Sequence, residues 1–329
     1  MKYIKITLAV LWICTAVQVS AQSARSAEPA IAYSQHGVLT LATASGRVVR
    51  TIKTAVPVGD FSISKDTSTV VFVPLNSKTH GGPLYLLKTR TGKLVRLTKG
   101  PYFNKKSRSE VYSDPDLSPA GTLAVFAIHA QATGDAVEAA GPGAVVDLKT
   151  RAVKLLQSTV DVDGNGAAFV NEPLWSPDGK RIVVNFEAGA ALTSLDSLSK
   201  LQDLSGLMDG GDWNHVLTWL GNECVVYIAG KNPADAAQNP ARVLNLKTHK
   251  VRDLSAVIDV PATSLTNLVA VSRSIRLRRN GQQLSVEGPK TSWKIPYDES
   301  TFVRILAKKN GSNAAGCDNS RERVTEPNN

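Results

Sequence analysis

The feature that most constrains the fold of this chain is an internal repeat: a short strand, a tight turn and an apolar strand. The turns are rich in Gly, Asp, Asn and Pro, which is typical of β-hairpins. The four copies are ISKDTSTVVF at 63–72, LSPAGTLAVF at 117–126, WSPDGKRIVV at 175–184 and WLGNECVVY at 219–227. They recur at intervals of roughly 44 to 58 residues, and a period of that size is typical of β-propeller blades.

Further hairpin patterns alternate with these copies. They are LATASGRVVRTI at 41–52, LKTRTGKLVRL at 87–97, LKTRAVKLL at 148–156, LDSLSKLQDLS at 195–205 and LKTHKVRDLS at 246–255. Two hairpins supply the four strands of one blade. A lone blade cannot cover both of its apolar faces, so blades stack around an axis and bury these faces against each other. The sequence therefore predicts an all-β fold: a six-bladed β-propeller of four-stranded antiparallel blades.

Closure of the ring is expected to involve the C-terminal part of the chain. Residues 30–52 supply only the outer strands of the first blade. The later blades begin near Asp60, Asp114, Glu172, His215 and Thr266, and the last uses the turn Asn280-Gly281. The segment TFVRILAK at 301–308 alternates like a strand and belongs to no other blade. We expect it to be the innermost strand of the first blade, which would remove the open edges of the ring.

The motif W-S-P-D-G-K followed by an apolar strand resembles the repeat of the TolB-like, WD-repeat-like propellers. Their relatives include the propeller domains of the prolyl oligopeptidase and dipeptidyl peptidase families. The resemblance covers about residues 30–308. It implies a periplasmic or extracellular propeller that mainly binds other molecules. In that family the SPDG residues form structural turns, so the resemblance carries over no functional residue.

The N-terminus has the pattern of a secretory signal peptide over residues 1–21. Lys2 and Lys5 precede an apolar stretch that is too short to span a bilayer, and Val19-Ser20-Ala21 fits a cleavage site. Residues 22–29 are expected to be a linker, residues 30–308 the propeller and residues 309–329 a disordered polar tail. We therefore expect a periplasmic or secreted protein with no transmembrane segment after cleavage after Ala21.

The charge of the chain is basic. The formal net charge of +10 becomes +8 when Lys2 and Lys5 are removed with the signal peptide. This balance favours an anionic neighbour such as phospholipid head groups, lipopolysaccharide or an acidic glycan, or it serves solubility alone. Nucleic acid is not expected outside the cytoplasm, and a monomer is expected. Cys224 lies in the apolar run CVVYIA and is expected to be a buried thiol, although a bridge to Cys317 stays open.

Residues 161–172, DVDGNGAAFVNE, match the calcium loop D-x-D-x-N-G-x5-E. The ligands would be Asp161, Asp163, Asn165 and Glu172. An EF-hand needs flanking helices, but both flanks here have strand patterns. Turn chemistry alone accounts for the Asp, Asn and Gly residues of this loop. Glu172 also occupies the blade-start position of Asp60 and Asp114, which lack such a loop. We therefore expect no cofactor, with calcium as the alternative.

The chain contains no G-x-S-x-G, no H-E-x-x-H and no cysteine pair at zinc spacing. The preferred hypothesis is a non-enzymatic module that binds an envelope protein, a peptide or a glycan. Long loops and an acidic channel mouth place its binding face on the side of the inter-blade connections. The candidate binding residues are Asp60, Asp114, Glu172, His215, His80 and His129. His36 is expected on the same face. Two alternatives remain: a metal-dependent, polysaccharide-acting enzyme resembling the oligogalacturonate lyases, and a scaffold whose tail does the binding.

Overall fold

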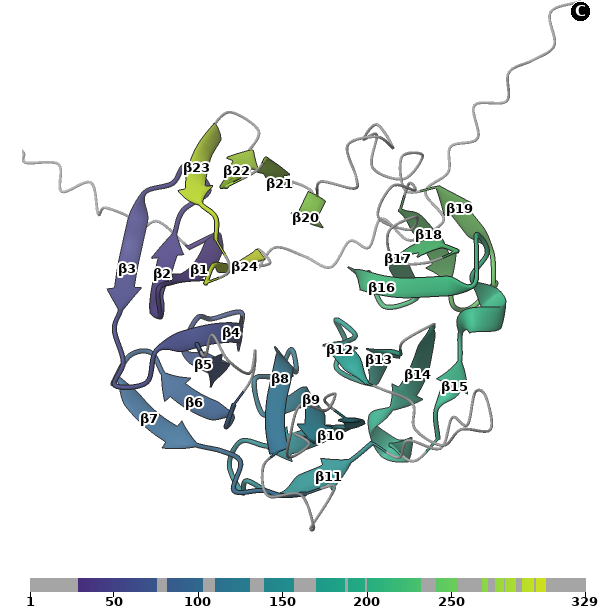
Figure 1. Ribbon diagram of the computed structural model, residues 1–329, viewed down its shortest axis with the longest axis horizontal. Helices are drawn as coiled ribbons and strands as arrows, with labels where there is room; N and C mark the ends of the chain where they lie inside the picture. Colours follow the sequence, from purple (N-terminus) through teal and green to yellow (C-terminus); the bar gives the residue numbers. More distant parts are fainter. Residues whose placement is uncertain are drawn as a thin grey trace, which may run out of the picture.

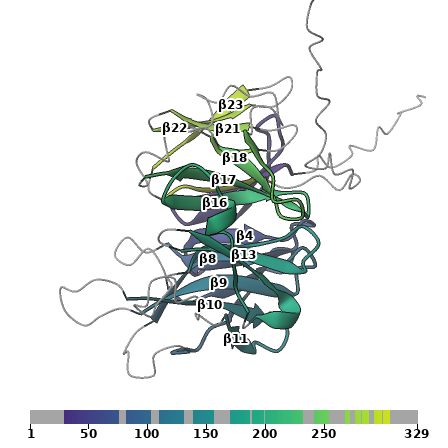
Figure 2. The ribbon, with the colours of Figure 1, turned by 90° about the vertical axis from the view of Figure 1, so that its right-hand side faces the viewer.

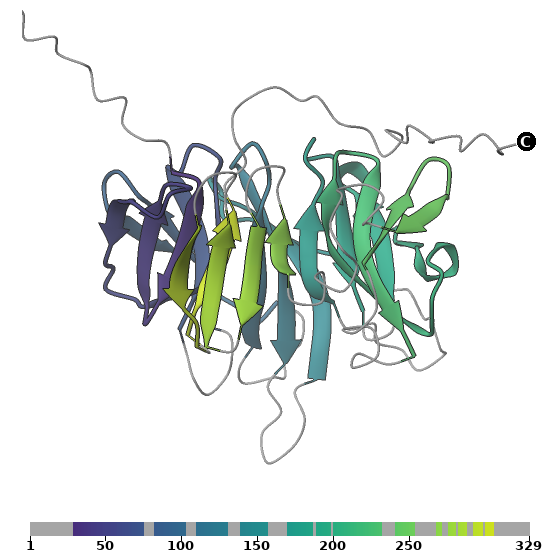
Figure 3. The same cartoon turned by 90° about the horizontal axis from the view of Figure 1, so that it is seen from above.

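The fold consists of six four-stranded antiparallel sheets placed around a central axis, as Figure 1 shows. This computed structural model describes residues 29–75, 82–102, 110–130, 139–156, 170–186, 189–198, 200–231, 241–253, 268–271, 276–280, 282–287, 292–298 and 300–305. In the side views of Figures 2 and 3 the sheets lie side by side in one layer. The expected all-β propeller of six blades is therefore confirmed.

The first three blades are given from the innermost strand outward. Blade 1 contains β24 (Phe302–Ile305), β1 (Ile31–Gln35), β2 (Val38–Ala42) and β3 (Val48–Ile52). Blade 2 contains β4 (Val58–Ile63), β5 (Thr69–Pro74), β6 (Tyr85–Lys88) and β7 (Lys93–Arg96). Blade 3 contains β8 (Glu110–Leu117), β9 (Leu123–Ala130), β10 (Ala139–Asp147) and β11 (Val153–Leu155).

The last three blades follow the same order. Blade 4 contains β12 (Asn171–Trp175), β13 (Arg181–Asn185), β14 (Ala190–Ser194) and β15 (Gln202–Asp203). Blade 5 contains β16 (Trp213–Leu220), β17 (Cys224–Gly230), β18 (Arg242–Asn245) and β19 (Val251–Asp253). Blade 6 contains β20 (Leu268–Val271), β21 (Arg276–Asn280), β22 (Gln283–Glu287) and β23 (Ser292–Pro296). The short 3-10 helices η1 (Leu195–Ser197) and η2 (Ser205–Leu207) flank β15.

The C-terminal strand completes the first blade. Strand β24 pairs antiparallel with β1, and the register places Ile31 opposite Ile305 and Ser34 opposite Phe302. This confirms the predicted innermost strand of the first blade for Phe302–Ile305, while residues 306–308 lie outside the described residues. Among the described residues, no helix has the length and apolar character that a membrane crossing requires. The predicted signal peptide and tail lie outside the described residues.

The tight turns between inner and second strands are held by local side chains. In blade 4 the Ser176 hydroxyl donates to Asp178 at 2.6 Å and accepts from the backbone N–H of Arg181 at 2.9 Å. Ser64 and Asp66 repeat this arrangement in blade 2 at 2.6 Å. Hydrogen bonds from Ser64 and Ser68 lower the pKa of Asp66 to about 2. These residues close their own turns, which agrees with the structural role expected for them.

The blades pack through apolar side chains and two tryptophans. Trp175 is buried between blades 3 and 4, and its indole N–H donates to the carbonyl of Asp116 at 3.1 Å. Trp219 repeats the bond one blade later, to the carbonyl of Leu174 at 3.2 Å. Trp175 is the more buried of the two rings, since Trp219 is only partly buried. Cys224 is fully buried and disulfide-bonded, so the expected free thiol is wrong, and its partner lies outside the described residues.

The turns between third and outer strands share one backbone geometry. Gly92, Arg151 and His249 each donate their N–H to the carbonyl four residues earlier, at 2.9, 2.8 and 2.8 Å. Their φ angles of 69°, 62° and 57° are all left-handed. Arg151 therefore occupies the place that glycine fills in blade 2, where the left-handed backbone is free of Cβ strain. The LKT strings of blades 2 and 3 are consequently offset by two residues in the structure, since Thr89 corresponds to Leu148.

Candidate functional site

The inner strands of blades 2, 3 and 4 each carry a β-bulge at their acidic residue. The pairing register shifts between Val58 and Phe61, between Ser113 and Asp116, and between Asn171 and Leu174. The residues inside these shifts include Asp60, Asp114 and Glu172. A bulge re-aims the side chain that it carries. The backbones of Asp114 and Glu172 are left-handed, with φ of 49° and 42°.

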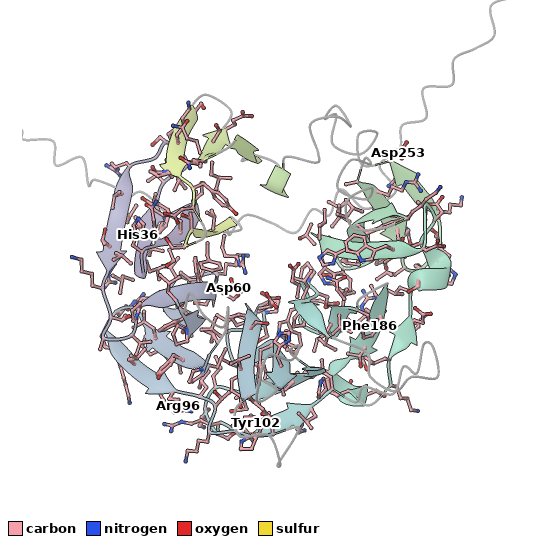
Figure 4. All side chains as sticks on the ribbon, in the orientation of Figure 1. His36, Asp60, Arg96, Tyr102, Phe186 and Asp253 are labelled. Atoms are coloured by element: carbon pink, nitrogen blue, oxygen red, sulfur yellow. The ribbon has the colours of Figure 1, made fainter. Side chains whose placement is uncertain are left out.

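Asp60 is the most buried of these acids, and Figure 4 labels it close to the central axis. Its side chain is 13% exposed, and its Oδ1 accepts from Arg304 of β24 and from the N–H of Phe61, both at 2.8 Å. Burial raises the pKa of Asp60 to about 7 against the opposing effect of Arg304, and the charges of Asp114 and Glu172 raise it further. The three acids thus influence each other electrostatically.

Asp114 lies at the start of a polar chain that reaches the next strand. Its Oδ2 accepts from the Ser113 hydroxyl at 2.6 Å, and the Ser113 hydroxyl lies 2.8 Å from Nε2 of His129. The carboxylate also accepts from the backbone N–H of Glu172, which links blade 3 to blade 4. Burial raises the pKa of Asp114, while the Ser113 hydrogen bond opposes the rise.

Glu172 continues the chain toward blade 5. Its Oε2 lies 3.0 Å from Nε2 of His215, and the side chain of Glu172 is 55% exposed. The hydrogen bond from His215 lowers the pKa of Glu172 more than burial raises it. The His215 ring stacks on Trp213, with ring centroids 5.4 Å apart and planes 2° apart. Glu172 is therefore a solvent-accessible carboxylate, and the ring of Trp213 holds its partner His215 in place.

Two residues of this region were missed by the sequence interpretation. Arg304 supplies the cation beside Asp60. Asp116 joins three blades, because it accepts from the Ser62 hydroxyl at 3.1 Å and from the N–H of Trp175 at 2.8 Å. Burial raises the pKa of Asp116 despite these bonds. The one available signal for Arg304 was its position in the segment 301–308, which was expected to be an innermost strand.

The structure brings together most of the predicted binding residues. Asp60, Asp114, Glu172, His129 and His215 form the connected set, which we call the channel cluster together with Arg304. His36 lies apart, 3.7 Å from Asp298, with 73% of its side chain exposed. His80 and the calcium-loop residues Asp161, Asp163 and Asn165 lie outside the described residues. Within the described part of the chain, no three His, Cys, Asp or Glu side chains are grouped to hold a metal ion.

Comparison with known proteins defines the class by its fold. No protein-family model matches the sequence, and no curated protein sequence matches it either. TolB from Acinetobacter baumannii is similar with a TM-score of 0.51 and 18% identity, over 84% of this chain and 65% of TolB. The chain thus spans slightly less than two thirds of the length of that TolB.

Two further solved structures show weaker similarity. A structure assigned as TolB from Agrobacterium tumefaciens gives a TM-score of 0.47 and 16% identity over 69% of this chain and 76% of that one. An oligogalacturonate lyase in complex with manganese gives a TM-score of 0.45 and 13% identity. The match covers 72% of this chain and 65% of the lyase chain. The similarity to the Acinetobacter TolB structure shows the TolB-like β-propeller fold alone, so the function must be argued from the chain's own site.

Proposed function

We propose that this protein is a non-enzymatic, secreted or periplasmic binding module whose channel cluster takes a cationic group of its partner. The partner would be an envelope protein, a peptide or a glycan, and the cationic group an amino or guanidinium group. The observation that carries the proposal is the convergence of Asp60, Asp114 and Glu172 at the bulges of three adjacent inner strands.

The charges of the cluster support a cationic ligand. Three carboxyl groups meet one arginine, and the burial of Asp60 and Asp114 raises the pKa of each because a charged carboxylate is costly there. A cation that enters the mouth would reduce the repulsion among the acids and favour their charged forms. Glu172 is the accessible member, since 55% of its side chain is exposed. It would make the first contact with the ligand.

The bulges give the site its precision. Asp114 and Glu172 hold left-handed backbones, and the N–H of Glu172 donates to the carboxylate of Asp114, which restrains the Asp114 side chain. Strained backbone of this kind clusters at binding and catalytic sites. A carboxylate that its neighbours hold in one orientation suits the recognition of a charged ligand group. No observation in the described residues favours the alternative of a polysaccharide-acting enzyme.

The test is the double variant Asp114→Asn with Glu172→Gln. Asparagine tolerates the left-handed backbone of position 114, and both changes keep the size of the side chain while they remove the charge. The variant and the wild type are immobilised and used to capture partners from envelope extract. The control is Asp196→Asn in η1, which removes one negative charge at an exposed position, whereas the double variant removes two.

We expect the double variant to lose capture with a nearly unchanged melting temperature, and the control to retain it. Acetylation of amino groups in the extract should weaken capture by the wild type if that cation is an amine, because it removes the ligand charge. Unaltered capture by the double variant, or a large fall in its melting temperature, would make the acids structural. Loss of capture on deletion of residues 310–329 alone would instead assign binding to the tail.

A further inference from the structure

A second concave site lies at the outer rim, between blades 2 and 3. It has a volume of about 380 Å³ and is lined by Leu97, Lys99, Tyr102, Lys149, Thr150 and Arg151. Figure 4 labels Tyr102 and Arg96 at the rim, far from Asp60 beside the axis. The volume is within the range of small-ligand sites, about 300–1,000 Å³. This rim pocket is therefore distinct from the channel cluster.

The lining of the rim pocket is basic. Among the described residues that line it, three of six are Lys or Arg and none is acidic. No ion pair joins Lys99, Lys149 or Arg151 to an acid within the described residues. The acids next to the pocket are hydrogen-bonded to backbone N–H groups, and the charge of Lys149 also helps to lower the pKa of Asp147. Oδ1 of Asp147 accepts from the N–H groups of Lys149 and Thr150, at 2.9 and 2.7 Å, and Glu110 accepts from the N–H of Tyr102 at 2.7 Å.

Both walls of the pocket are held in place. On the blade 2 side, the N–H of Lys99 donates to the Tyr102 hydroxyl at 2.9 Å. On the blade 3 side, Asp147 closes the turn that carries Lys149 and Arg151, and the N–H of Arg151 donates to the Asp147 carbonyl at 2.8 Å. The basic side chains themselves are exposed at the rim. The basic side chains of the rim pocket therefore extend into solvent from a backbone that hydrogen bonds hold in place.

We propose that the rim pocket binds a phosphate group, supplied either by a soluble phosphate or by the head group of an anionic phospholipid. Lysines act as point charges for phosphate, and the planar fork of an arginine matches two phosphate oxygens at once. Tyr102 lines the same space, and its hydroxyl can donate to a further oxygen, whereas the Thr150 hydroxyl already donates to Asp147. The basic balance of the whole chain draws anions toward its surface.

Two variants test the pocket, and blade 5 provides a matched control. Lys149→Gln removes one cation from the pocket. Arg151→Gly removes another at a left-handed position where blade 2 already has Gly92, so it should not destabilise the turn. The control is Lys247→Gln, because the N–H of Lys247 donates to Asn245 at 2.9 Å in the corresponding turn of blade 5. Lys247 does not line the rim pocket.

Inorganic phosphate is titrated into each protein by calorimetry at low ionic strength, and co-sedimentation is measured with phosphatidylglycerol and with phosphatidylcholine vesicles. We expect saturable phosphate binding or selective binding to phosphatidylglycerol. Lys149→Gln and Arg151→Gly should each weaken it about tenfold at unchanged melting temperature, and Lys247→Gln should have no effect. Vesicle binding identifies a head group as the source, and binding of phosphate alone a soluble ligand. The proposal is wrong if neither probe binds, or if the control variant loses as much as the pocket variants.

Discussion

The replacement Asp60→Asn tests how the channel cluster titrates. Burial raises the pKa of Asp60 from 3.8 to about 7, against the opposing effect of Arg304, and Asp114 and Glu172 add to the rise. The folded protein therefore holds a proton that the unfolded chain releases. Stability that depends on this proton is fully present below the unfolded pKa and is lost as the pH rises through the folded pKa.

The size of the effect follows from the pKa shift. The rise in the pKa of Asp60 from 3.8 to about 7 corresponds to a total change of about 4 kcal/mol in the free energy of unfolding. About 2–3 kcal/mol of this change occurs between about pH 5 and about pH 8. Asparagine does not titrate, and its oxygen can still accept from Arg304 and Phe61, which both donate to Oδ1 of Asp60. The variant should therefore gain stability relative to the wild type as the pH rises.

The assay is urea unfolding of the wild type and of Asp60→Asn at about pH 5, 6, 7 and 8, with the free energy of unfolding extrapolated to water. We expect the difference between the two proteins to shift by about 2–3 kcal/mol in favour of the variant across this range. Asp196→Asn, the exposed control, should show no such shift. Parallel curves for Asp60→Asn and the wild type would refute the reasoning, since Asp60 would then not titrate between these values.

Three further outcomes are expected from the packing, the closure and the loop. Trp175→Ala should lower the free energy of unfolding by about 3–5 kcal/mol in chemical denaturation, because the ring is buried between blades. Trp219→Ala should cost less because that ring is only partly buried, and the reverse order would contradict the packing argument. Deletion of residues 301–329 should abolish cooperative melting because it removes β24. Deletion of residues 310–329 alone should leave the melting temperature nearly unchanged. Equal melting of the two truncated proteins would contradict the role of β24 in blade 1. Calorimetric titration of millimolar calcium should release no heat above background, and saturable heat that is lost in Asp161→Asn would restore the calcium alternative.

The fold could be predicted from the sequence because its determinants are local and repeated. Ser176, Asp178 and Gly179 close their turn through bonds to neighbours, so the turn is recognisable without any knowledge of the partner blades. The pairing of Phe302–Ile305 with the first blade could be predicted because one alternating segment was left without a blade. Each of these inferences depended on patterns of a few residues.

The candidate site was predictable only in part. The blade-start acids could be found because the repeat aligns them, but the partner of Asp60 lies 244 residues away in sequence. Asp114 and Asp116 would share one face of a regular strand, since side chains alternate with a period of two. The bulge between Ser113 and Asp116 breaks that alternation, and the two acids have different partners. A bulge of this kind leaves little trace in composition.

The pairing of the first and last strands has a mechanical consequence. Because β1 and β24 are antiparallel with Ile31 opposite Ile305, the two ends of the ring leave the sheet side by side. A force that pulls these ends apart loads the Ile31–Ile305 pair first and breaks the following pairs one at a time. The force needed to separate the two strands is then that of about one hydrogen-bonded pair at a time. A protein held by both ends would open at blade 1 under tension, whereas one held by a single end would transmit no load through its ring.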